Sequence, residues 1–99
     1  MAKKKFKMAL PFQADPLFEE RRRLVNESWH LLYRTTLIRK QIEVAYFLEH
    51  NASNEVIRNR AIQEKPRLRA ELASTEMKMA RVNAAIHKLN IEVRKRKQN

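Results

Sequence analysis

Histidines and carboxylates are the side chains of this sequence best suited to metal binding or acid–base chemistry. His30, His50 and His87 lie far apart, and their spacing is not typical of a metal site. Glu27 and His30 have the Glu-x-x-His spacing of di-iron helical bundles. Such a site needs a second copy of that motif, which the sequence lacks. We therefore expect no metal site.

Two residue types are missing from the sequence, and their absence excludes several kinds of site. Without cysteine, the chain has no disulfide and no thiolate ligand. Without glycine, it has no glycine-dependent phosphate loop, dinucleotide fingerprint or nucleophile elbow. An elongated helical unit also rarely encloses a catalytic pocket. We predict that the chain has no catalytic residues, binds no cofactor and is not an enzyme.

Basic side chains are the most abundant polar feature of the 99-residue chain. It has 22 Lys and Arg against 11 Asp and Glu, a formal net charge of +11. Such a surplus favours binding to polyanions, whether nucleic acid, an acidic protein surface or an anionic membrane. The alternative is a solvated charged face with basic tails. The predicted RNA or polyanion contacts are Lys3, Lys4, Lys5, Lys7, Arg21, Arg22, Arg23, Arg67, Lys78, Arg81, Lys88, Arg94, Lys95, Arg96 and Lys97.

The elements that position these residues are predicted to be helices. Residues 1–14 are expected to form a basic extended arm, and residues 15–99 a long helical hairpin. Asp15 and Pro16 are typical of a helix start, so the first helix is expected over about 16–50. Residues 51–54 resemble a turn, in which Ser53 or Asn54 can cap a second helix over about 55–97. Pro66 predicts a bend or kink in that helix.

Apolar residues at alternating spacings of four and three predict that the two helices pair as in an antiparallel coiled coil. We expect Leu24 to lie near Val82, and Ile38 near Leu68. The seam of the second helix comprises Leu68, Leu72, Thr75, Met79, Val82, Ile86, Leu89 and Val93. The looser seam of the first comprises Leu17, Arg21, Leu24, Ser28, Leu31, Thr35, Ile38, Ile42 and Ala45. The fold class is therefore all-α.

Further apolar residues lie away from both seams, and a two-helix hairpin cannot cover them. The alternative is that the alanines merely supply helix propensity on a solvated face. We prefer an interface, since a helix that is apolar on several sides is usually buried on several sides. The predicted protein-interface residues are Trp29, Tyr33, Phe47, Ala73, Met77, Ala80, Ala84 and Ile91.

One tripeptide resembles a known family. Leu32, Tyr33 and Arg34 spell the motif of the LYR-motif proteins, and residues 56–60 are loosely similar to that family's second arginine-bearing segment. The family consists of small, basic three-helix proteins that serve mitochondrial complexes and bind acyl carrier protein. The resemblance implies an accessory subunit of a mitochondrial respiratory complex.

These observations favour a structural subunit of a large ribonucleoprotein, such as a ribosome or mitochondrial ribosome. Basic termini would contact rRNA phosphates, while the apolar faces contact neighbouring proteins. An alternative partner is tubulin or another filament protein, for a microtubule-associated or axonemal role. The LYR-like role is a third hypothesis. No apolar run is long enough to span a membrane. We expect an intracellular location, with mitochondrion and cytoplasm both open.

Overall fold

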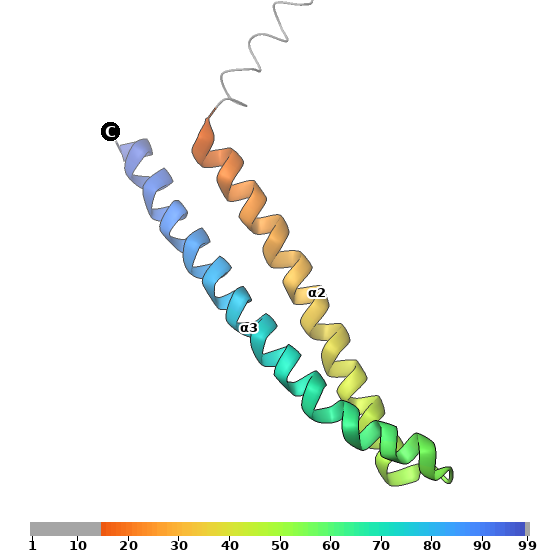
Figure 1. The fold of residues 1–99 in the computed structure, drawn as a ribbon. Coiled ribbons are helices and arrows are strands. Elements are labelled where there is room, and N and C mark those ends of the chain that lie inside the picture. Colours follow the sequence, from red (N-terminus) through yellow and green to blue (C-terminus); the bar gives the residue numbers. More distant parts are fainter. Residues whose placement is uncertain (1–14, 99) are drawn as a thin grey trace, which may run out of the picture. The chain divides into compact units, whose positions relative to one another are not determined.

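The computed structural model describes residues 15–98, and their fold is an all-α helical hairpin (Figure 1). Helix α2 comprises Pro16–Asn51 and helix α3 comprises Glu55–Gln98. The predicted arm of residues 1–14 lies outside the described residues, as do residue 99 and the side chains of residues 97 and 98. No helix within 15–98 has a stretch both apolar and long enough to cross a membrane.

The start of α2 is fixed by Asp15. Its Oδ1 accepts a hydrogen bond from the Leu17 amide at 3.0 Å, and its carbonyl accepts one from the Glu19 amide at 3.2 Å. Pro16 occupies the first helical position, where its missing N–H has no helical partner to lose. An aspartate cap followed by proline therefore begins the helix where the sequence indicates.

The turn after α2 is held by side chains and contains no left-handed residue. Asn54 caps α3, since its Oδ1 accepts hydrogen bonds from the amides of Val56 at 2.8 Å and Ile57 at 3.4 Å. Arg58 Nη2 donates to the Ala52 carbonyl at 2.6 Å, which joins the second helix to the end of the first. No described residue has a positive φ, so this reversal needs no glycine.

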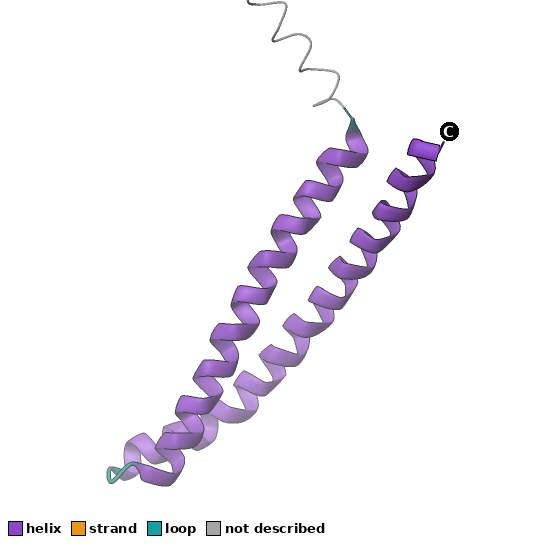
Figure 2. Ribbon diagram, turned by 180° about the vertical axis from the view of Figure 1, so that it is seen from behind, coloured by secondary structure: helices purple, strands orange, loops and turns teal. Residues whose placement is uncertain are grey.

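Pro66 lies inside α3, which continues as helix on both sides of it. Proline lacks an N–H, so the carbonyl of Ile62 loses its helical hydrogen bond, and the pyrrolidine ring crowds that carbonyl. Figures 1 and 2 show α3 changing direction in this region, a short way after the turn. The predicted bend is therefore present within a continuous helix.

The described residues form two compact units. The turn unit is Trp29–Ala80, and its core is a buried cluster of Ile38, Ala45, Ala61 and Leu68. Ile42, Leu48 and Leu72 pack against this cluster and are partly buried. The predicted neighbours Ile38 and Leu68 are thus in one core. The small side chains of Ala45 and Ala61 allow the two helices to approach closely near the turn.

Two threonines are buried in the seams of the turn unit. Thr35 is 1% exposed and Thr75 is 5% exposed. Each hydroxyl donates a 2.8 Å hydrogen bond to a carbonyl of the preceding helical turn, that of Leu32 for Thr35 and that of Glu71 for Thr75. The polar atoms are satisfied within their own helices, so both residues can occupy core positions.

The terminal unit comprises the described residues 15–28 and 81–98. Leu24 and Val82 are buried in it. Polar contacts between its two segments have an antiparallel order: Arg21 Nε donates to Asn90 Oδ1 at 2.7 Å, and Ser28 Oγ donates to Asn83 Oδ1 at 3.2 Å. The other predicted seam residues Ile86, Leu89 and Val93 are half-buried here.

Candidate functional site

The histidines are dispersed in the structure as they are in the sequence. His30 and His87 are exposed, while His50 packs edge-on against the Tyr46 ring with the centroids 4.4 Å apart. Within residues 15–98, no group of three or more His, Cys, Asp or Glu side chains could hold a metal ion. Glu27 is also exposed. The described residues therefore offer no metal-binding arrangement.

Part of the predicted basic surface is already paired within the chain. Arg22 and Arg23 form ion pairs with Glu19 and Glu20, one helical turn earlier. Arg96 Nη1 lies 3.2 Å from Asp15 Oδ1. Exposed pairs of this kind contribute little stability and leave the cations accessible to solvent.

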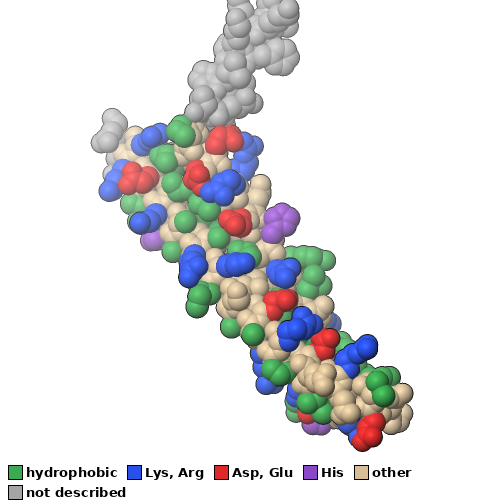
Figure 3. Space-filling model, in the orientation of Figure 1, with side chains coloured by type: hydrophobic (Ala, Val, Ile, Leu, Met, Phe, Trp, Pro, Cys, Tyr) green, Lys and Arg blue, Asp and Glu red, His purple; other side chains and the backbone are tan. Residues whose placement is uncertain are grey.

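Several other residues predicted to contact polyanions are not engaged in this way. Among the described side chains, those of Lys78, Lys88 and Arg94 are exposed and make no ion pair or hydrogen bond. Lys95 has only a 4.0 Å approach to Glu92. Figure 3 shows Lys and Arg side chains interspersed with hydrophobic ones on the face in view. Lys3, Lys4, Lys5 and Lys7 lie outside the described residues, as does the Lys97 side chain.

The predicted interface residues are all exposed. The exposed fraction is 65% for Trp29, 66% for Tyr33 and 61% for Phe47, all on α2. Met77 is 60% exposed and Ile91 38% exposed on α3. The alanines of the same set, also exposed, are Ala73, Ala80 and Ala84. Large apolar side chains thus remain in water on both helices of the turn unit, away from its core.

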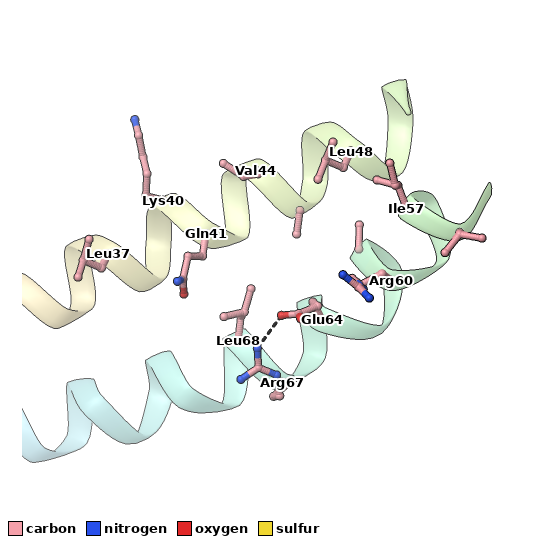
Figure 4. Close-up of a pocket in the computed structure, with 13 residues that line it drawn as sticks. Leu37, Lys40, Gln41, Val44, Leu48, Ile57, Arg60, Glu64, Arg67 and Leu68 are labelled. Carbon is pink, nitrogen blue, oxygen red and sulfur yellow. Dashed lines mark hydrogen bonds and ion pairs between the residues drawn. The ribbon is translucent and has the colours of Figure 1, made fainter. Parts of the chain in front are cut away.

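The turn unit also contains a groove that the sequence analysis missed. It has a volume of about 570 Å³ and runs between the flanks of α2 and α3 (Figure 4). Its apolar lining is Leu37, Val44, Ala45, Leu48, Val56, Ile57, Ala61 and Leu68. Gln41, Lys40, Arg60, Glu64 and Arg67 complete it. Several of these apolar side chains are exposed, Val56 by 71% and Val44 by 52%.

The polar side chains of the groove are mostly cationic. Arg67 donates to Glu64 Oε2 at 2.6 Å, and this hydrogen bond raises the pKa of Arg67. Glu64, the one carboxylate of the lining, is therefore engaged by one of its three cations. Lys40 lies 3.9 Å from Glu43, and Arg60 has no ion-pair partner among the described residues. The groove is apolar with a basic edge.

A sequence signal for the groove exists. Leu37, Gln41, Val44 and Leu48 repeat at spacings of four and three, beside the main seam of α2. Such a second stripe indicates a second packing face. The facing residues Val56, Ile57 and Arg60 belong to the segment likened above to the LYR-motif family.

Leu32 and Tyr33 of the LYR tripeptide are exposed, and Arg34 approaches Glu71 at 3.5 Å. Residues 15–98 form two helices, where that resemblance implies three.

The most shielded ion pair of the described chain joins Lys65 to Glu49. Their side chains are 14% and 23% exposed, and the Lys65 ammonium also lies 5.2 Å from the centre of the Tyr46 ring. The hydrogen bond from Lys65 lowers the pKa of Glu49 below its ordinary value of 4.5, although partial burial raises it. The pair links α3 near its bend to the end of α2.

We expect Glu49→Gln to lower the melting temperature at neutral pH, because Lys65 would lose its charge partner. A carboxylate with a lowered pKa stabilises the fold above its unfolded pKa, here 4.5, and this contribution is lost as the pH falls through the folded pKa. The variant should therefore lose less stability than the parent chain between about pH 6 and about pH 3. Glu43→Gln is the control, since Glu43 is 73% exposed. If the melting temperatures of the parent chain and of Glu49→Gln fall equally as the pH is lowered, the stabilising role of the Glu49–Lys65 pair would be contradicted.

Comparison with known proteins adds no assignment. No protein-family model matches the chain, and neither a curated protein nor a solved structure matches it.

Proposed function

We propose that the chain is a non-catalytic structural subunit of a large ribonucleoprotein, such as a ribosome or mitochondrial ribosome. The observation that carries the proposal is the exposure of cations without partners, Lys78, Lys88 and Arg94, on the same helix as large uncovered apolar side chains. Cations that make no ion pair are available to phosphates, which need positive charge but little geometric precision. The four lysines of residues 3–7 add to this surplus.

Protein neighbours are the second part of the proposal. Trp29, Tyr33 and Phe47 are each more than half exposed. Covering a large apolar side chain is worth about 1.5–3 kcal/mol, so partners gain by binding these faces. Rigid helices with exposed apolar and basic residues suit an intracellular assembly of protein and RNA, in the mitochondrion or the cytoplasm.

The exposed aromatic side chains also favour a second candidate, a structural protein of a microtubule or axonemal lattice. There, apolar contacts with filament proteins would dominate, and the basic residues would face acidic tubulin surfaces. The two candidates differ in whether RNA holds the chain in its assembly.

Sedimentation of the tagged chain from cell lysate, with and without RNase, distinguishes them. We expect it to move with a particle containing rRNA, and to leave that position once RNase dismantles the particle. Co-sedimentation with tubulin that RNase does not affect would overturn the ribonucleoprotein proposal.

A pair of substitutions separates the contributions of the two surfaces in the same experiment. Ala80→Glu places a charge on the exposed apolar side of α3, while Lys88→Glu reverses a cation that has no partner. In a ribonucleoprotein, both variants should sediment less with the particle. If Ala80→Glu alone prevents incorporation, protein contacts suffice and the RNA role is wrong.

A further inference from the structure

We propose that the groove of the turn unit is a docking site for an acidic amphipathic helix of a partner protein. Such a helix has a row of apolar side chains with carboxylates on both sides of it. This inference goes beyond the proposed function, because it concerns a protein partner and does not depend on RNA.

The shape of the groove fits a helix. Its α2 wall runs from Leu37 to Leu48, which is about 17 Å or roughly three helical turns. Figure 4 shows α2 and α3 forming the two facing walls, with Leu48 and Ile57 close together near the turn. Two paired helices leave a groove along their flank, and a third helix completes a bundle by filling it with side chains. The spacing of Leu37, Val44 and Leu48 matches that of a helix-packing face.

The apolar lining is incompletely covered without a partner. Leu37, Val44, Val56 and Ile57 are 46%, 52%, 71% and 44% exposed, respectively. Beneath them, Ala45, Ala61 and Leu68 are already buried in the core. A partner's apolar side chains would thus contact exposed valine, leucine and isoleucine above a preformed floor, without rearrangement of the core.

The cations lie at both edges of the groove and select the charge of the partner. Lys40 is on the outer edge of α2, where its side chain points away from α3 (Figure 4). Arg60 and Arg67 are on the α3 side, where Glu64 pairs with Arg67 and Arg60 has no ion-pair partner among the described residues. Lys40 has only a 3.9 Å approach to Glu43, and both of these side chains are largely exposed. A helix seated in the groove therefore has positive charge along both sides. Carboxylates flanking its apolar row complement that charge, whereas lysines would be repelled.

The same charges disfavour occupants from this chain. Residues 1–14 contain four lysines and no carboxylate, Asp15 being the first acidic residue of the chain. The cations at the groove edge therefore repel this strongly basic segment. A second copy of the chain would bring a net charge of +11. An acidic partner is the occupant that the electrostatics favour.

Fluorescence anisotropy with a labelled synthetic helix tests the proposal on the full chain. The probe has leucines at helical spacing flanked by glutamates, and a matched peptide has lysines in place of the glutamates. We expect the acidic peptide to bind at least about tenfold more tightly at low salt. Val44→Ser combined with Ile57→Ser should weaken binding at least about tenfold, because apolar contacts are lost. Leu32→Ser, at an exposed α2 position outside the groove, should leave binding unchanged.

Charge reversal provides the sharper comparison. Lys40→Glu combined with Arg60→Glu should exchange the preference, so that the lysine peptide binds better than the glutamate peptide. All four substituted groove residues are exposed, so each variant should keep its helix content. Circular dichroism checks this. An unchanged preference in the charge-reversed chain would overturn the proposal, as would equal losses for Leu32→Ser and the groove variant.

Two further outcomes would identify a different occupant and also overturn it. If sedimentation equilibrium shows a dimer that Val44→Ser with Ile57→Ser abolishes, the groove binds a second copy. Residues 1–14 contain two aromatic residues, Phe6 and Phe12. If replacing both by Ser raises the affinity for the acidic peptide, the chain's own N-terminal segment competes for the groove.

Discussion

Replacement of Ile38 by Ala is expected to lower the free energy of unfolding by about 2–5 kcal/mol. Ile38 is 2% exposed and shares its core with Ala45, Ala61 and Leu68. Alanine neighbours cannot expand into the vacated space, so a cavity would remain. Small domains are stable by only about 5–15 kcal/mol, which makes this loss a large fraction of the total. Urea unfolding followed by circular dichroism measures it.

Leu32→Ala is the matched control, because it removes the same number of carbon atoms from α2. Leu32 is 45% exposed, so the expected change is within about 0.5 kcal/mol. The Leu32 carbonyl, which accepts the Thr35 hydroxyl, is unchanged by this substitution. Equal destabilisation by the two variants would contradict the assignment of Ile38 to the core.

Replacement of Arg94, Lys95 and Lys97 by Gln is expected to have the largest effect on RNA binding. When the logarithm of the binding constant is plotted against the logarithm of the salt concentration, each phosphate contact adds about 0.7–0.9 to the steepness of the line. Loss of three contacts should reduce the slope by about 2–3 and weaken binding at low salt by about tenfold or more. Filter binding to a short RNA duplex over a series of salt concentrations measures both quantities. Arg96 is retained because it bonds to Asp15.

The control variant removes the same number of positive charges, but from the turn unit. Replacing Arg34, Arg39 and Lys40 by Gln also removes three positive charges, but Arg34 and Arg39 face Glu71 and Glu76. If the cluster at residues 94–97 contacts phosphates, the control should alter the salt slope much less. Equal slopes for the two triple variants would show that net charge alone governs binding.

The seams and helix ends could be predicted from the sequence because their causes are local or periodic. Leu68, Thr75 and Val82 occur at heptad spacing, and all three are buried. The cap at Asp15 needs only an acceptor before a proline and a helical run. For the second helix, Ser53 and Asn54 were equivalent on chemistry, and the structure assigns the cap to Asn54.

The groove and the long-range ion pairs could not be predicted in the same way. The groove depends on which flanks of α2 and α3 face the same side, and the spacing of residues within each helix does not determine that. Lys65 and Glu49 are far apart in sequence, and many other carboxylates were equally available to Lys65. The spacing of apolar residues predicts an apolar face on each helix. Which faces of the two helices lie next to each other depends on the tertiary structure.

The turn without a left-handed residue has a consequence for how this fold can change over evolution. A reversal that depends on a left-handed residue ties the fold to glycine or, at some cost, to Asn and Asp, since bulkier side chains do not tolerate that conformation. Here the backbone stays in regions open to every L-amino acid, and Asn54 supplies only a short acceptor that Ser, Thr or Asp also provides. Substitutions can accumulate through the turn while the hairpin persists. Homologous hairpins would then share the spacing of apolar residues more than the identity of any one residue.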